Sequence, residues 1–88
     1  MVTKTVTVIN PQGFHMRPAT VFVTEMGKFQ SKIILQVGEK KADGKSLMAI
    51  IASCIKCGSE VTVSCDGVDE QAALDKAAGM IESGLGEV

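Results

Sequence analysis

The sequence predicts an α+β domain in two layers, a four-stranded sheet with three helices on one face, in the order β-α-β-β-α-β-α. Four segments alternate between apolar and polar residues, a pattern typical of half-buried strands. Three other segments follow a proline or a capping residue and carry apolar residues at helical spacing. With 88 residues, we expect one domain spanning 1–88.

The alternating pattern places strands at residues 2–9, 32–37, 40–42 and 60–65. Their inward residues are expected to be Val6, Val8, Ile33, Leu35, Val37, Val61, Val63 and Cys65. Gly38-Glu39 suits a two-residue hairpin turn with glycine first. Lys40 and Lys41 carry charges that suit the edge of a sheet.

Each predicted helix has its own start and stop signals. The first runs from about residue 16 to residue 26 and ends near Gly27, expected as a left-handed cap. Its apolar face comprises Ala19, Phe22, Val23 and Met26. Ser46 is expected to cap a short helix through residue 52 or 53. Asp69 caps the last helix, with Val68 as a staple residue, Leu74, Ala77 and Ile81 buried, and Gly84 at its end.

Composition argues against nucleic-acid and membrane functions. The net charge is −1, the basic residues are scattered, and Trp and Tyr are absent, so neither a basic stripe nor aromatic stacking is supported. No apolar run approaches the ~20 residues of a membrane span. Residues 1–9 lack the apolar core of a signal peptide. We therefore expect a cytoplasmic protein.

Three cysteines raise the question of a metal or redox site. Cys54 and Cys57 form a CxxC, but only Cys65 remains as a further thiol, and His15 is far away in sequence. A zinc CxxC usually has a second pair of ligands, and a redox CxxC usually opens a helix. This one is expected to close a helical stretch before Gly58. We therefore interpret the cysteines as small buried apolar residues and expect no metal and no cofactor.

Residues 13–20 contain the single histidine and the single arginine of the chain. Pro18 is best tolerated in a first helical turn, which puts His15 at or just before a helix N-terminus. Unpaired N–H groups and a guanidinium from Arg17 would together attract an anion such as phosphate. A nucleophilic imidazole there indicates a phosphoryl carrier, whereas a plain surface or capping histidine is the alternative.

The segment Gly13-Phe14-His15-Met16-Arg17-Pro18-Ala19-Thr20 resembles the active-site segment of the HPr family, histidine phosphocarriers of the bacterial sugar phosphotransferase system. Gly44-Lys45-Ser46-Leu47-Met48 resembles the regulatory-serine segment of the same family. The resemblance covers essentially the whole chain. It implies that the sheet is antiparallel, an open-faced sandwich. Met16, in place of a small or polar residue, and the cysteine content depart from the family pattern.

The resemblance also implies a function. Enzyme I, charged by phosphoenolpyruvate, would phosphorylate His15, and the carrier would pass the group to enzyme IIA domains for sugar uptake. The protein would be a relay component rather than a free-standing enzyme, and we expect it to be a monomer. Ser46 would be a target of HPr kinase/phosphorylase, and the phosphoserine form would bind a catabolite control protein. Backbone groups of Met16 and Arg17, with Pro18, would form the phosphate site.

Docking of partners requires an apolar surface near His15. The candidates are Met16, Thr20, Leu47, Met48 and Ile51. Leu47 and Ile51 could instead belong to the core, but a short helix cannot bury all its apolar residues. We expect Met48 to be exposed, because methionine suits surfaces that accept several partners.

Three other interpretations remain open. A regulatory relative without phosphohistidine would lack His15, which is present here. A carrier of a nitrogen-related or dihydroxyacetone-linked branch would share the motif. A non-catalytic α+β interaction domain would take up no acid-labile phosphate.

Overall fold

A computed structural model describes residues 1–85 of the chain, and its elements follow the predicted order. The strands are β1 (Val2–Thr7), β2 (Lys32–Val37), β3 (Lys40–Asp43) and β4 (Glu60–Asp66). The helices are α1 (Met16–Met26), α2 (Leu47–Ala52) and α3 (Glu70–Glu82). The first strand is therefore shorter than predicted, because the chain leaves the sheet after Thr7.

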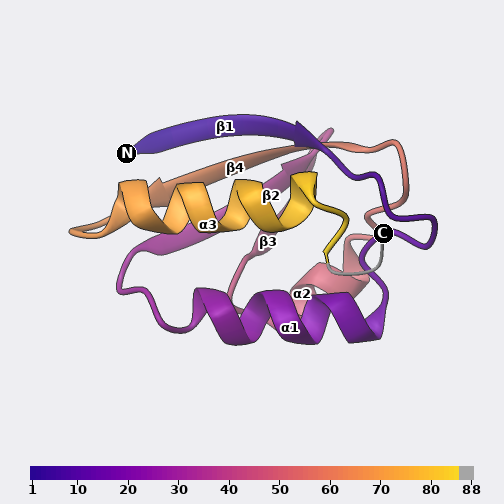
Figure 1. The fold of residues 1–88 in the computed structure, drawn as a ribbon, viewed down its shortest axis with the longest axis horizontal. Coiled ribbons are helices and arrows are strands. Elements are labelled where there is room, and N and C mark those ends of the chain that lie inside the picture. The colour runs from indigo at the N-terminus through magenta and orange to yellow at the C-terminus, as the bar shows by residue number, and fades with distance from the viewer. Residues whose placement is uncertain (86–88) are drawn as a thin grey trace.

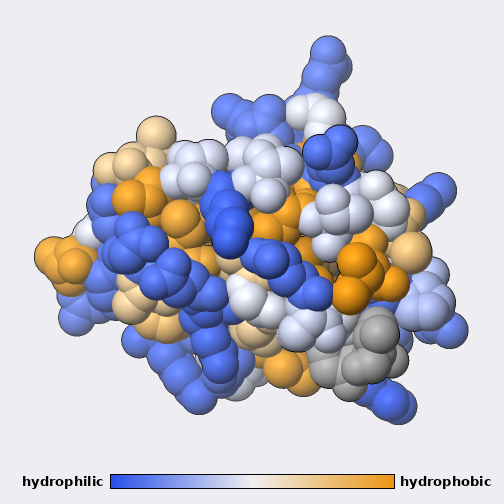
Figure 2. Space-filling model, turned by 45° about the horizontal axis from the view of Figure 1, so that its top comes forward, coloured by the Kyte–Doolittle hydropathy of each residue, from blue (hydrophilic) through white to orange (hydrophobic). Residues whose placement is uncertain are grey.

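The strands form one antiparallel sheet in the order β1-β4-β2-β3. The three helices lie together beneath it, as Figure 1 shows, so the predicted two-layer, open-faced arrangement is confirmed. The oblique view in Figure 2 shows hydrophilic and hydrophobic residues intermixed on this part of the surface. The two-residue hairpin turn is also confirmed, since Gly38 has φ of +59° between β2 and β3.

Apolar residues of strands and helices meet in a core between the two layers. All predicted inward strand residues are buried except Val37, which is partly buried. Phe14 and Phe22 pack edge to face in this core, with ring centroids 5.3 Å apart. Burial of the α1 face at Ala19, Phe22 and Met26 is confirmed, and Val23 packs at its margin. Each of these contacts holds α1 against the sheet and so positions the residues at its N-terminus.

Two predicted helix signals are wrong. Gly27 has φ of −63°, so α1 ends without a left-handed residue. Val68 is 89% exposed and staples nothing, because the turn before α3 points it into solvent. At the other end of α3 the prediction is confirmed. Gly84 has φ of +85°, and its N–H donates to Ile81 while the next N–H donates to Met80, which closes the helix.

The predicted burial of the cysteines is confirmed for Cys65 and wrong for the other two. Cys54 and Cys57 are exposed, because α2 ends at Ala52 and the CxxC lies in the loop that follows rather than in the helix. Among residues 1–85 no group of three or more potential ligands is placed to hold a metal ion. In the same part of the chain no helix has the length and apolar character needed to cross a bilayer.

Candidate functional site

His15 is the N-cap residue of α1, with extended backbone angles of φ −83° and ψ −176°. The first hydrogen bond of the helix joins the Ala19 N–H to the His15 carbonyl at 3.1 Å. The N–H groups of Met16 and Arg17 therefore have no acceptor within the helix, and Pro18 has no backbone N–H. This terminus presents two backbone donors and the positive end of the helix dipole beside an imidazole.

An open hollow of about 350 Å³ lies at this helix end, lined by Pro11, Gln12, His15 and Arg17. Arg17 is exposed and His15 is half-buried. The surface is therefore shallow, as a site that takes up a group and hands it to another protein must be. The donors and the guanidinium can together stabilise a phosphoryl group carried on the ring.

The loop before His15 is held by contacts that its own sequence does not reveal. Gly13 has φ of +63°, and a Cβ there would overlap with the carbonyl oxygen of Ile55. The same carbonyl accepts the Phe14 N–H at 3.0 Å. The side-chain amide of buried Asn10 donates to the Gly13 carbonyl. Nothing in the sequence marks Ile55 as the neighbour of Gly13.

Ser46 caps α2 as predicted. Its hydroxyl accepts the Ala49 N–H at 3.2 Å, and its own N–H donates to the Asp43 carbonyl at 3.0 Å. Lys45 precedes it and donates from Nζ to the Phe29 carbonyl at 2.6 Å, which ties this turn to the loop after α1. A phosphate on Ser46 would meet the N-terminal N–H groups of a helix.

The predicted docking residues come from two helices that pack against each other, α1 and α2 (Figure 1). Met48 is 74% exposed and Met16 is 56% exposed, as expected for contact residues. Thr20 is exposed on α1, where its hydroxyl donates to the Met16 carbonyl at 2.7 Å. Leu47 and Ile51 are partly buried and pack on the core, so each offers only part of its surface. Val21 is also 48% exposed on α1, which the helical spacing did not single out.

Comparison with known proteins gives the family. A family model described as the PTS HPr component phosphorylation site matches residues 2–83. The chain belongs to the HPr family. As an HPr-family protein it is a phosphocarrier of the phosphotransferase system, and its partners belong to that system.

Individual HPr relatives agree in sequence and in fold. The phosphocarrier protein HPr of Treponema pallidum (strain Nichols) is 43% identical over 74 residues, 84% of each chain. The crystal structure of HPr-C-His from Thermoanaerobacter tengcongensis matches with a TM-score of 0.95 at 36% identity, covering 100% of this chain and 99% of that one.

One HPr-like relative is described as a dimer. The structure of Crh, a catabolite repression protein of Bacillus subtilis with a swapping domain, matches with a TM-score of 0.77 at 37% identity, over 96% of this chain and 97% of that one. HPr membership alone therefore does not establish the predicted monomer.

Proposed function

We propose that this HPr-family chain accepts a phosphoryl group on His15 from phosphorylated enzyme I and passes it to enzyme IIA domains that serve sugar uptake. The observation that carries the proposal is the position of His15 as the N-cap of α1, beside the N–H groups of Met16 and Arg17, which have no acceptor within that helix. In this proposal the chain is a monomeric, single-domain carrier of phosphoryl groups in the cytoplasm.

Phosphoryl transfer depends mainly on positioning and on electrostatic stabilisation by the protein. The lone pair of a neutral ring nitrogen of His15 attacks phosphorus, the P–N bond of the donor phosphohistidine breaks, and its electrons return to the donor imidazole. The transferred group carries negative charge over its oxygens, which the two backbone N–H groups and the guanidinium of Arg17 stabilise. Onward transfer to enzyme IIA repeats the step in the opposite sense, and the open hollow lets both partners approach.

The test is incubation with enzyme I and labelled phosphoenolpyruvate. Wild-type protein is expected to take up acid-labile label, and His15→Ala is expected to take up none while its circular dichroism spectrum and Tm stay unchanged. Label that persists in this variant would refute His15 as the acceptor. Absence of label in the folded wild-type protein would favour a non-catalytic interaction domain. Enzyme IIA proteins from nitrogen-related or dihydroxyacetone-linked branches, assayed in parallel, distinguish those branches from sugar uptake.

We propose a second, regulatory use of Ser46. Its place as the N-cap of α2 beside the exposed Met48 favours a phosphoserine that adds charge to the docking surface. HPr kinase/phosphorylase would add this group, and a catabolite control protein would bind the product. Incubation with that kinase and ATP should give an acid-stable phosphate that is absent in Ser46→Ala.

A further inference from the structure

The loop after α2 carries two exposed thiols that the proposed relay does not use. Cys54 and Cys57 are both exposed, with Ile55 and Lys56 between them. Cys65 differs, because burial in the core raises the pKa of its thiol and keeps it from the thiolate form. An oxidant in solution therefore reaches Cys54 and Cys57 first.

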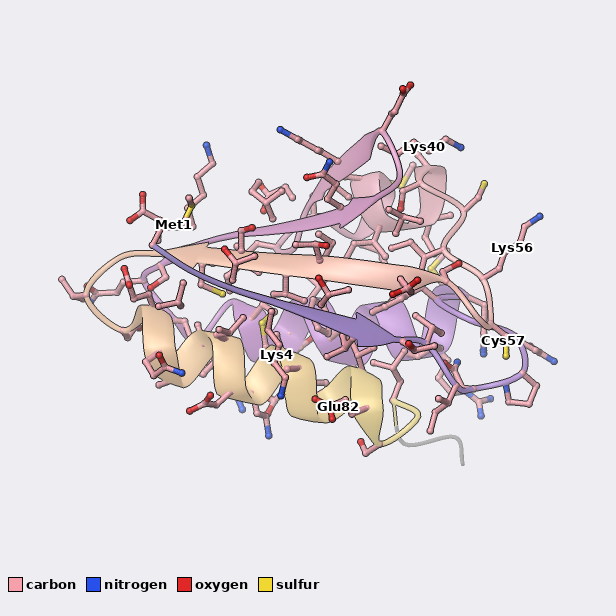
Figure 3. The ribbon with its side chains drawn as sticks, turned by 90° about the horizontal axis from the view of Figure 1, so that it is seen from above. Met1, Lys4, Lys40, Lys56, Cys57 and Glu82 are labelled. Atoms are coloured by element: carbon pink, nitrogen blue, oxygen red, sulfur yellow. The ribbon has the colours of Figure 1, made fainter. Side chains whose placement is uncertain are left out.

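The same loop supports the chain segment that leads to His15. We call residues 54–59 the support loop. Its contacts with residues 8–14 are Val8 N–H to Ser59 O at 2.9 Å, Gly58 N–H to Val8 O at 2.8 Å, Cys57 S–H to Ile9 O at 3.7 Å and Phe14 N–H to Ile55 O at 3.0 Å. Figure 3 shows Cys57 beside the chain that leaves β1, while Lys56 extends into solvent. Cys57 therefore contacts residues 8–14 directly. Ile55, which follows Cys54, contacts the same segment through its hydrogen bond with Phe14.

The backbone between the two thiols is constrained at both ends. Cys54 has φ of +53°, which lies in the left-handed region that residues other than Gly, Asn and Asp rarely adopt. The Ile55 side chain is 3% exposed and anchored in the core. A disulfide requires its two Cα atoms to lie within about 4.4–6.8 Å and its bond vectors to converge. The Cys54 N–H donates to the Ile51 carbonyl, and the Ser59 N–H donates to the Lys56 carbonyl, so Ile55 lies between two hydrogen-bonded turns. A bridge between residues 54 and 57 would act directly on the peptide groups on either side of Ile55.

We propose that Cys54 and Cys57 are an oxidisable dithiol, and that their disulfide slows phosphoryl transfer at His15 by displacing the Ile55 carbonyl from Phe14. The proposal rests on the function proposed for His15. The oxidant is hydrogen peroxide. One thiolate attacks the peroxide oxygen, an S–O bond forms, the O–O bond breaks, and hydroxide leaves as water after protonation. The second thiolate attacks the sulfenic sulfur, the S–S bond forms, and the hydroxyl group leaves as a second water.

Oxidation also removes the S–H group of Cys57, so the Ile9 carbonyl loses its donor. Two of the hydrogen bonds named above, those that join Cys57 to Ile9 and Phe14 to Ile55, are then altered by one reaction. Displacing a reacting group by about 1 Å can cost up to about 10²-fold in rate, so a small movement at Phe14 is sufficient to slow its neighbour.

The test treats purified protein with hydrogen peroxide and compares wild type, the Cys54→Ser/Cys57→Ser double variant and Cys65→Ala. Mass spectrometry on wild type and Cys65→Ala should show the loss of two hydrogens, with a peptide bridged between residues 54 and 57, and the double variant should show neither. Phosphorylation by enzyme I should slow by about tenfold on oxidation, recover with dithiothreitol, and be insensitive to peroxide in the double variant.

A readout that does not need enzyme I keeps the two proposals separable. Amide hydrogen exchange at Phe14 should accelerate on oxidation of wild type and stay unchanged in the double variant. Absence of the bridged peptide, or a disulfide that links two molecules instead, would overturn the dithiol. A bridged protein with unchanged Phe14 exchange and an unchanged rate would overturn the coupling to His15. Failure of the reduced protein to accept phosphate would instead refute the proposed function.

Discussion

Asp69 accepts hydrogen bonds from both the backbone N–H and the hydroxyl of Ser31, and so joins the start of α3 to the start of β2. A third bond comes from the Gln30 N–H at 2.8 Å. The residue stands at the N-cap position, as the sequence predicts, yet its carboxylate caps no N–H of α3. It satisfies donors of the loop after α1 instead.

This contact predicts a pH dependence of stability. The hydrogen bond from the Ser31 hydroxyl, followed by that from the Gln30 N–H, holds the pKa of the Asp69 carboxyl below its ordinary value. The unfolded state then binds the proton more readily, so the stabilisation is fully present above the ordinary Asp pKa and is lost as pH falls through the folded pKa. Urea unfolding of wild type and Asp69→Asn should therefore give free energies that differ most near neutral pH and converge in acid.

The matched control is Asp75→Asn, at an exposed position of α3 where the carboxylate accepts a hydrogen bond from Gln71 of the same helix. Its curve should run parallel to that of wild type. An Asp69→Asn variant as stable as wild type at neutral pH would contradict the role assigned to the carboxylate.

Arg17 is expected to matter for transfer rather than for stability. It is exposed, and its charge has most effect when negative charge gathers on the transferred group. Loss of one such charge contact typically costs about 10²-fold or more in rate, so Arg17→Ala should slow transfer to enzyme IIA by that order and leave Tm unchanged. Arg17→Lys should recover only part of the rate, because it keeps the charge and loses the planar fork. Lys41→Ala, which removes an exposed charge on β3, serves as the control for a general charge effect. A lowered Tm with normal kinetics would contradict the prediction.

Ser46→Asp should weaken the interaction with enzyme I without unfolding the protein. Asp is a good N-cap, so the bond to the Ala49 N–H and the stability of α2 should survive. The added charge lies beside exposed Met48, where desolvation and like-charge repulsion across an interface can cost several kcal/mol. KM for this protein as substrate of enzyme I should rise, while Ser46→Asn, with the same shape and no charge, should behave as wild type. Equal KM values for the Asp and Asn variants would exclude the electrostatic explanation.

Gly13→Ala tests the support of the loop before His15. Alanine there must adopt φ of +63° and also displace the Ile55 carbonyl. Gly38→Ala is the matched control, because Gly38 has φ of +59° and open space around its Cβ position. Both variants should lose about 1 kcal/mol or more from the positive φ. Only Gly13→Ala should lose additional stability and slow phosphorylation, as chemical denaturation and the enzyme I assay would show. Identical losses in the two variants would mean that the close approach to Ile55 has no consequence.

The sequence by itself determined the order of the elements, the inward faces of the strands, the cap of α2 and the positions at which α3 begins and ends. These depend on local chemistry and on periodicity, which are readable along the chain. It also placed His15 at the start of α1, because Pro18 restricts that position directly. The functional roles of the site residues and the docking surface remain predictions.

Only the tertiary structure decided which distant segments meet. The Asp69 carboxylate accepts hydrogen bonds from Ser31 rather than from its own helix, and Ile55 lies beside Gly13 and Phe14. Both contacts arise because packing of the layers places separate loops within hydrogen-bond distance. Local rules also misjudged exposure at Cys54 and Cys57, since small apolar residues are buried only where an element carries them inward. Burial and long-range hydrogen bonds are properties of the assembled layers, and a linear pattern does not contain them.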